Sequence, residues 1–406
     1  MNKLAVAIFT PFFSAGDELE SGIGVHYRDL AIGLKQSGED VVVFHFPYDT
    51  TESKSWDFEG IKVHSVGFKT PSFTKIRGIG LLCNLVKFFD FFEAFQLFAK
   101  SRLIFSKYHS LKSFDIIEAS SNRGVAFGVS TLKRRPPIFT RVSTTMSQIF
   151  KSENQKPDLN FRFAAKFEEK QILMSDHIVT HTQNHANEIS GMLNLDPTLF
   201  KIIPHGISSN LKTEFNVRNR HDSSTVRILY VGRLEHRKGL DVFVRAIPTI
   251  LESFPDIHID ICGTGEMLEK AKADLLASHS SKIVFHGYQT REALDLFYSD
   301  CDIFVGPSRY ESFGIVYLEA MRFSKPVIAC NSGGTPEVVL DGITGILVEP
   351  GNVDFLAKAV LKLANDQVLR KKMGEEGRIR LEKFFSMKTL IETTKSCYLE
   401  NLTRTI

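Results

Sequence analysis

Hydrophobic and polar positions in the first half of the chain alternate between strand-like and helix-like patterns. An apolar run at residues 4–9 leads into a loop with the sequence SGIG at residues 21–24. A helical pattern follows, and a second β-rich run occupies residues 41–46. A strand, a glycine-bearing loop, a helix and a second strand form a βαβ unit, whose strands lie parallel. Further strands of the same half are predicted at residues 61–66, 115–118, 137–142 and 177–180.

The second half repeats this alternation with a clearer pattern. A strand is predicted at residues 226–231, Gly232 follows it, and a helix begins near Leu240. Each half is therefore expected to be an α/β, doubly wound, Rossmann-like domain with a mostly parallel sheet. Further strands, separated by helical patterns, are predicted at residues 257–262, 283–285, 303–305 and 326–329.

Domain boundaries follow from where these patterns stop. We expect an N-terminal domain at residues 1–205 and a C-terminal domain at residues 206–385. Residues 386–406 are expected to form a C-terminal helix. The composition of that helix leaves open whether it packs back against the N-terminal domain.

Composition narrows the class of protein. The 406 residues are 43% hydrophobic and 24% charged, which excludes collagen-like, low-complexity and wholly disordered chains. The net charge of +3 is too small to imply a nucleic-acid partner. Five cysteines without a C-x-x-C pair argue against a disulfide framework or a structural zinc site and fit a reducing cytoplasm. No run of about 18 apolar residues occurs, so a transmembrane helix is not expected.

Positive charge is concentrated in one segment. Residues 61–141 contain 14 Lys and Arg against 4 acidic residues. Four phenylalanines in this segment share one helix face: Phe88, Phe91, Phe95 and Phe98. Two interpretations stay open. The helix belongs to the core, or it forms a peripheral membrane surface at the inner face of the plasma membrane, where Phe inserts and Lys/Arg attract anionic lipids.

The most informative stretch is VGPSRYESFGIVYLE at residues 305–319. It predicts a strand end followed by a helix that begins near residues 313–314. The amide groups at the start of such a helix bind phosphate, because they are unpaired and lie at the positive end of the helix dipole. Glu311 and Glu319 suit the hydroxyl groups of a sugar and a ribose on either side of that phosphate. Taken alone, however, these two acids are more simply explained by helix-dipole compensation and by solvent exposure.

A second group of residues favours ligand binding over the simpler explanation of Glu311 and Glu319. The segment GRLEHRKG at residues 232–239 places Arg233 and Lys238 at the carboxyl end of a predicted strand, where open α/β sheets bind ligands. A guanidinium fork and a mobile ammonium can together neutralise a diphosphate without a metal ion. We therefore expect no metal and no other cofactor.

Through these motifs the chain resembles family 4 of the retaining, nucleotide-sugar-dependent glycosyltransferases, also known as glycosyl transferases group 1. In the first half the resemblance is weaker and covers residues 21–44 and 203–207. It implies the GT-B fold, in which two Rossmann-like domains face a cleft, with the donor on the C-terminal domain and the acceptor on the N-terminal one. The matching segments of the second half are GRLEHRKG (232–239), GTGE (263–266), PSRYESFGIVYLEAM (307–321), KPVIACNSGGTPEVV (325–339) and GITGILVEPGN (342–352).

The resemblance also implies residue roles. Arg233 and Lys238 would hold the donor diphosphate and stabilise it as it leaves, and Glu311 would contact the hexose hydroxyls. These three are the expected catalytic residues. Glu319 would hold the ribose hydroxyls. The remaining donor-binding candidates are Gly22, Gly24, Gly232, Gly263, Gly265, Tyr288 (beside the base), Ser312, Phe313, Gly314 and Ile315; Gly22 and Gly24 would meet the diphosphate or the acceptor from the N-terminal domain.

The N-terminal domain departs from the family pattern at two positions. Many relatives carry a histidine after the strand that corresponds to residues 138–142, and Ser143 occupies that place here. Another common histidine corresponds to Glu118. Whether Ser143 or Glu118 takes over the acceptor-side role is left open by the sequence.

The leading hypothesis is thus a retaining hexosyltransferase that acts on a hydroxyl acceptor, a glycan or lipid-linked glycan of cell-surface polysaccharide synthesis. A nucleotide-sugar epimerase of the same fold and a non-catalytic protein that binds sugar nucleotides are the alternatives. The presence of Arg233, Lys238 and Glu311 together favours the transferase. The donor base, the sugar, the acceptor and the oligomeric state are not specified.

Overall fold

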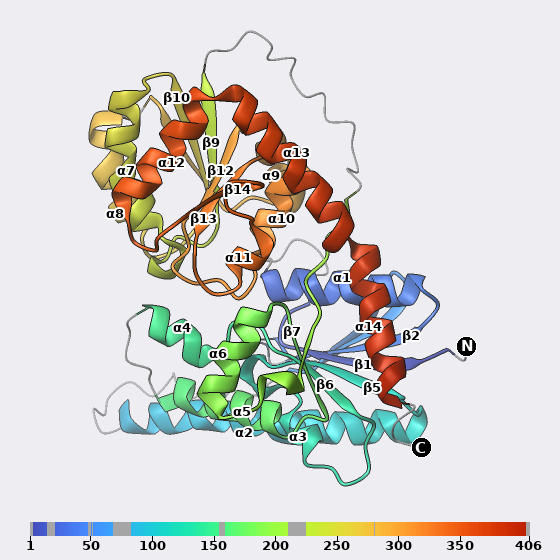
Figure 1. The fold of residues 1–406 in the computed structure, drawn as a ribbon. Coiled ribbons are helices and arrows are strands. Elements are labelled where there is room, and N and C mark those ends of the chain that lie inside the picture. Colours follow the sequence, from blue (N-terminus) through green and yellow to red (C-terminus); the bar gives the residue numbers. More distant parts are fainter. Residues whose placement is uncertain are drawn as a thin grey trace. The chain divides into compact units, whose positions relative to one another are not determined.

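The computed structural model of the chain describes residues 3–13, 21–47, 50, 52–67, 83–153, 159–209, 225–279 and 281–402 (Figure 1). The chain divides into two compact units. Unit 1 consists of residues 1–181, 186–203 and 390–406, and unit 2 of residues 182–185 and 204–389.

Unit 1 is built on an eight-stranded sheet with the order β3-β4-β2-β1-β5-β6-β7-β8. Its strands pair in parallel except at one edge, where β3 runs antiparallel to β4. The strands are β1 (Ala5–Thr10), β2 (Asp40–His45), β3 (Lys54–Phe58), β4 (Ile61–Ser65), β5 (Ile116–Ser120), β6 (Ile138–Arg141), β7 (His177–Thr180) and β8 (Phe200–Ile202).

The strands predicted from apolar runs are confirmed to within about two residues, but β3 and β8 are missed. β3 has an alternation of exposed and half-buried positions and no fully buried residue, so it carries no hydrophobic signal. Because β3 pairs only with β4, it forms an edge of the sheet, where such polar strands are common.

Helices and short turns connect the strands of unit 1. Ser21 caps the first helix, since its side-chain oxygen accepts a hydrogen bond from the amide of Gly24 at 3.0 Å. The elements are α1 (Gly22–Gln36), α2 (Cys83–Leu111), the 3-10 turn η2 (Asn122–Gly124), α3 (Phe127–Ser130), α4 (Met146–Glu153), α5 (Leu159–Leu173), α6 (Gln183–Leu193) and the 3-10 turn η3 (Pro197–Leu199). The first three residues of α6 belong to unit 2.

The helix α2 carries the phenylalanine stripe, but its described members do not share one environment. Phe98 is half-buried and packs against Phe127 and Phe167, at ring-centroid distances of 5.2 and 6.5 Å. Phe95 is 52% exposed. The side chains of Phe88 and Phe91 lie outside the described residues. A uniformly core-facing stripe is therefore wrong for the described part of α2.

Unit 2 contains a six-stranded, parallel sheet with the order β11-β10-β9-β12-β13-β14. Both faces of this sheet are buried. Ile228 and Tyr230 of β9 belong to one hydrophobic core and Leu229 to another, as expected for a doubly wound domain. The strands are β9 (Val226–Val231), β10 (Ile257–Cys262), β11 (Ile283–Gly287), β12 (Ile303–Gly306), β13 (Val327–Cys330) and β14 (Gly345–Val348).

Helices alternate with these strands, as the pattern predicts, and the predicted strands β9 to β13 are confirmed, but the edge strand β14 is missed. The elements are the 3-10 turn η4 (His236–Lys238), α7 (Leu240–Ser253), α8 (Leu268–His279), α9 (Arg291–Asp300), α10 (Ile315–Arg322), α11 (Thr335–Val338), α12 (Val353–Asn365) and α13 (Gln367–Phe384). The predicted C-terminal helix is α14 (Met387–Leu402). Its residues from Leu390 onward are part of unit 1, where Tyr398 packs against Phe139 of β6 at a centroid distance of 4.9 Å.

Candidate active site

The carboxyl ends of β9 and β12 are neighbours, because these strands pair in parallel. The loop after each strand is held against the other. A Cβ at Gly239 would lie 1.9 Å from the carbonyl oxygen of Pro307, so no larger residue fits at this position, whose φ is +72°. Arg309 forms a bidentate ion pair with Asp241, at 2.6 and 2.7 Å. The two loops therefore form one rigid edge of the sheet.

Glu311 lies at the centre of this edge and is 7% exposed. Its Oε1 accepts hydrogen bonds from the ammonium group of Lys238 and from Ser308 Oγ, the latter at 3.0 Å. Its Oε2 lies 3.7 Å from Nη1 of Arg237. A buried carboxylate with two cations on different oxygens is a charged cluster that can exchange partners with an anionic ligand.

Burial acts on both charges of this cluster. It would raise the pKa of Glu311, but Lys238 and Arg237 outweigh it and hold the pKa of that carboxyl below its usual value. Burial lowers the pKa of Lys238, and Glu311 opposes the shift. Mutual stabilisation therefore keeps this carboxylate ionised, and the lysine is the partner that burial destabilises.

The structure brings the predicted Lys238 and Glu311 into contact, but it places Arg233 differently. The side chain of Arg233 is 63% exposed, and its Nη2 lies 3.1 Å from Glu235 Oε1. Arg237, which the sequence analysis does not single out, is the buried arginine of this loop, 4% exposed. Arg237 could have been singled out from the sequence, because it stands next to Lys238 directly before Gly239.

The helix predicted after Glu311 is α10, and it begins at Ile315 with Gly314 at its N-cap. Gly314 has a φ of +91°, and a Cβ there would lie 2.3 Å from the ring of Tyr317. Ser312 and Phe313 are buried before the cap. The helix start predicted just after Glu311 is therefore present, and anion binding there stays a prediction.

Glu319 lies one turn inside α10 and is separate from Glu311. Its Oε2 accepts a hydrogen bond from the hydroxyl of Tyr298 at 2.9 Å. Burial raises the pKa of Glu319, against the opposing effects of Arg291 and the Tyr298 hydrogen bond. The half-buried carboxyl is thus oriented by Tyr298 of α9.

The predicted glycines after β9 and β10 have a packing role. A Cβ at Gly263 would lie 1.8 Å from Gly232 O, and one at Gly265 would lie 2.4 Å from Leu234 O. The loops are joined by a hydrogen bond from Leu234 N to Thr264 O at 2.9 Å. These glycines therefore bring the two loops together. Tyr288, directly after β11, is 39% exposed.

The candidate residues of unit 1 are Gly22, Gly24, Glu118 and Ser143. Gly22 and Gly24 lie in the first turn of α1, as predicted. Glu118 is fully buried in β5, where it accepts hydrogen bonds from Arg141 Nε and the Tyr398 hydroxyl, both at 2.7 Å. Glu118 is therefore a buried ion-pair partner, which favours a structural role over the acceptor-side role that the sequence leaves open. Ser143 lies two residues past β6, and its buried Oγ has no hydrogen-bond partner among the described residues.

His, Cys, Asp and Glu are side chains that commonly ligate metal ions in proteins. No group of three or more His, Cys, Asp or Glu side chains among those residues could hold a metal ion. An Asp-x-Asp triplet does occur, at Asp300-Cys301-Asp302, before β12. Asp302 accepts a hydrogen bond from the amide of Arg227 at 2.8 Å, and Asp300 pairs with the Arg227 side chain at 3.4 Å. Both acids thus serve the amino-terminal edge of the sheet, opposite the Glu311 cluster.

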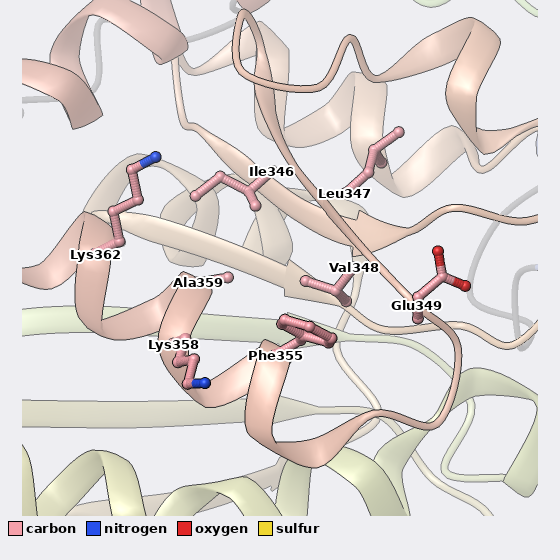
Figure 2. Close-up of a pocket in the computed structure, with 8 residues that line it drawn as sticks. All are labelled: Ile346, Leu347, Val348, Glu349, Phe355, Lys358, Ala359 and Lys362. Atoms are coloured by element: carbon pink, nitrogen blue, oxygen red, sulfur yellow. The ribbon is translucent and has the colours of Figure 1, made fainter.

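A separate pocket of about 310 Å³ lies between β14 and α12 (Figure 2). Ile346 and Val348 of the strand and Phe355 and Lys358 of the helix are among the residues that line it. It contains none of the predicted site residues. Because β14 is the edge strand of the sheet, this pocket is distinct from the cluster at the ends of β9 and β12.

Comparisons with known proteins agree with this architecture. A family model of glycosyltransferase family 4 matches residues 21–211, and one of glycosyl transferases group 1 matches residues 212–380. The uncharacterised glycosyltransferase MJ1178 of Methanocaldococcus jannaschii is 27% identical over 403 residues, which cover 98% of each chain.

Two further relatives extend the comparison. The D-inositol 3-phosphate glycosyltransferase of Corynebacterium diphtheriae is 28% identical over 297 residues, or 68% of each chain. Among solved structures, sucrose-phosphate synthase from Thermosynechococcus elongatus superposes with a TM-score of 0.78 at 20% identity, covering 99% of this chain and 100% of that one.

The two parallel-sheet units, the matches to both halves and the structural neighbour define a glycosyltransferase of the GT-B fold. Within that class the chain belongs to the family 4 type, as its sequence motifs predict.

Proposed function

We propose that the chain is a retaining glycosyltransferase that moves a hexose from a nucleoside-diphosphate sugar to a hydroxyl acceptor. The contact of Lys238 with buried Glu311 at the ends of β9 and β12 carries this proposal. Ligands of open α/β sheets bind at this edge, and a cation paired with a carboxylate there can move to a phosphate.

In this proposal, each group of the cluster has one task. Lys238 and Arg233 hold the diphosphate and stabilise the negative charge that develops as it leaves. Glu311 accepts hydrogen bonds from the hexose hydroxyls, and Glu319 from the ribose. The amides at the start of α10 add donors to the phosphate, which is a common use of a helix N-terminus. Gly232, Gly263, Gly265 and Tyr288 complete the donor side.

Retention is proposed to follow from front-face transfer. The acceptor hydroxyl attacks the anomeric carbon on the face from which the diphosphate leaves, and the leaving phosphate oxygen takes the acceptor proton. Burial of Glu118 supports this route, because both oxygens of that carboxylate already accept hydrogen bonds, from Arg141 and Tyr398, and neither is left to attack the sugar as a nucleophile. The cations and helix amides make a divalent metal and any other cofactor unnecessary.

The acceptor is proposed to be a glycan or lipid-linked glycan of cell-surface polysaccharide synthesis, bound by unit 1 near Gly22 and Gly24. The described surface of α2 supports a weak, reversible association with anionic membrane on the cytoplasmic side. Phe95, Leu103 and Leu111 are each more than half exposed there, beside exposed Arg102 and Lys107. Among the described residues, no helix has the length and apolar character to cross a membrane.

The proposal is tested by incubating the purified protein with UDP-, GDP- and ADP-hexoses, with and without a lipid-linked glycan acceptor. We expect nucleoside diphosphate release with one donor, an acceptor-dependent product and an anomeric configuration, measured by NMR, equal to that of the donor. An inverted product would contradict retention. Conversion of the donor sugar without an acceptor would instead indicate an epimerase. Activity that disappears in chelator and returns with Mg²⁺ or Mn²⁺ would contradict metal independence.

A further inference from the structure

Arg237 is the most deeply buried cation of the candidate active site, and nothing in the proposed chemistry yet uses it. Its Nη2 donates to Glu235 Oε1 at 2.8 Å and its Nη1 to the carbonyl oxygen of Tyr310 at 3.1 Å. The same Nη1 lies 3.7 Å from Glu311 Oε2. The guanidinium therefore links the loop after β9 to the loop after β12 and faces the oxygen of Glu311 that Lys238 does not touch.

Lys238 and Arg237 differ in how firmly they are held. The Lys238 side chain is 18% exposed and contacts Glu311 through a single ammonium group. The Arg237 side chain is 4% exposed and is fixed by two hydrogen-bond acceptors, Glu235 and Tyr310, beside its longer ion-pair contact with Glu311. In the proposed function, Lys238 turns to the donor diphosphate. Glu311 then loses its shortest cationic contact while it stays buried, and a buried carboxylate without a counter-charge is strongly disfavoured.

We propose that Arg237 is a positioning residue that retains the Glu311 carboxylate, ionised and oriented toward the hexose, when Lys238 moves to the diphosphate. This inference rests on the proposed function and deepens it. Lys238 then moves between the Glu311 carboxylate and the donor diphosphate, whereas Arg237 stays beside Glu311. Arg237 acts through Glu311 and does not bind the donor itself, because its guanidinium nitrogens already donate hydrogen bonds to Tyr310 and Glu235.

The groups that face Glu311 support this division. Lys238 and Arg237 approach it from η4, Tyr230 from β9 and Tyr317 from α10, with Glu235 behind Arg237. Burial raises the pKa of both tyrosines, so neither becomes charged. Ser308 also donates a hydrogen bond to Oε1 but carries no charge, so Arg237 is the cation of this group that can hold Glu311 ionised once Lys238 is engaged.

The test compares Arg237→Gln and Arg237→Lys with Arg309→Gln as the matched control. Arg309 is also an ion-paired arginine of this edge, but it faces Asp241 rather than Glu311. For each variant, kcat and KM for the donor are measured from pH 4 to pH 9, and binding of UDP, GDP and ADP is measured by calorimetry. Loss of a cation beside Glu311 should raise its pKa by about one unit.

For Arg237→Gln we therefore expect the acid limb of kcat, which reports the donor-bound enzyme, to move to higher pH by about one unit, with about a tenfold lower rate on that limb. Arg237→Lys keeps the charge but loses the fork, so its acid limb stays near that of the wild type while kcat falls. Arg309→Gln lowers the melting temperature and leaves the limb in place.

An unchanged acid limb in folded Arg237→Gln overturns the inference. Where that variant does not fold, Arg237→Lys decides: a lower melting temperature with unchanged kcat shows a merely structural role. A wild type that binds none of the three nucleoside diphosphates overturns the proposed function itself, so the two failures are distinguishable.

Discussion

Each unit of the protein buries a glutamate against an arginine, and the two carboxylates are held in different ways. Glu118 of unit 1 lies within a strand, and Arg141 and Tyr398 occupy its two oxygens at 2.7 Å each. Glu311 of unit 2 lies in a loop at the carboxyl edge of the sheet. One of its cations, Lys238, is a single mobile ammonium. A carboxylate saturated by rigid groups stabilises a fold, whereas one held partly by a mobile cation can accept a ligand.

The Glu118 cluster also explains how the C-terminal helix belongs to unit 1. Tyr398 and Thr394 of α14 reach Glu118 and Arg141, and Lys395 pairs with Glu39 at 2.6 Å. Residues more than 250 positions apart in the sequence are thus joined in one core. Buried ion pairs of this kind often add little net stability, but removing one partner leaves a charge uncompensated.

The largest effect is expected from breaking that pair. Glu118→Ala leaves Arg141 buried without its counter-charge, so the free energy of unfolding should fall by about 3–5 kcal/mol. Urea unfolding of wild type and variant measures this loss. Tyr398→Phe, which removes only one hydrogen bond to the carboxylate, should cost about 1.5–3 kcal/mol. A Glu118→Ala variant of normal stability but without turnover would mean that the cluster is catalytic.

The matching change in unit 2 should affect turnover and spare the fold. Lys238→Ala or Arg233→Ala should slow kcat by about 10²–10³, the usual effect of losing a preorganised donor to a developing charge. Steady-state kinetics, with the melting temperature as a control, measures it. Exposed Lys270→Ala on α8 serves as the matched variant. Near-normal turnover in either active-site variant would show that the phosphate assignment is wrong.

Another buried glutamate sharpens the contrast, because no ion pair to it is found among the described residues. Glu168 of α5 accepts hydrogen bonds from Ser121 Oγ and Met146 N, both at 2.8 Å. Burial raises its pKa from 4.5 to about 7. The folded protein therefore holds a proton that the unfolded chain releases between these values, and stability should fall by about 3 kcal/mol as the pH rises from about 4.5 to about 7.

Glu168→Gln tests this directly, since the amide cannot ionise. Urea midpoints measured from pH 4 to pH 8 should decline more steeply for the wild type than for the variant, which is the more stable protein at pH 8. The exposed Glu375→Gln on α13 should follow the wild type. Parallel curves for wild type and Glu168→Gln would show that Glu168 does not titrate in this range.

The smallest expected effect concerns the surface of α2. Co-sedimentation with acidic vesicles at low salt should show weak binding, because each basic residue near an anionic surface contributes about 1 kcal/mol and salt screens it. Phe95→Ser should remain folded and bind less. Leu296→Ser, an exposed apolar residue of unit 2, should bind like the wild type. Absence of wild-type binding at low salt would favour a water-soluble acceptor.

The sequence predicts the fold well because buried parallel strands leave uninterrupted apolar runs. The edge strand β3 has no buried face and left no such signal. Among site residues, Lys238 and Glu311 could be predicted from strand ends and motif. Their contact with each other, and the role of Arg237, depend on side-chain directions across two loops. Glu118 shows most clearly what could not be predicted from the sequence, since its hydrogen-bond partner Tyr398 lies 280 residues away along the chain.

The central claim, that the Lys238–Glu311 cluster binds a nucleoside diphosphate while the Glu118–Arg141 cluster only stabilises the fold, is tested most directly by ligand-induced thermal shift. UDP, GDP and ADP are each added to wild type, Lys238→Ala and Tyr398→Phe. We expect one diphosphate to stabilise the wild type, by about 2.7 kcal/mol at 100 times its Kd. Tyr398→Phe should start from a lower melting temperature and show the same shift, and Lys238→Ala should show little or none. A full shift in Lys238→Ala would contradict the account.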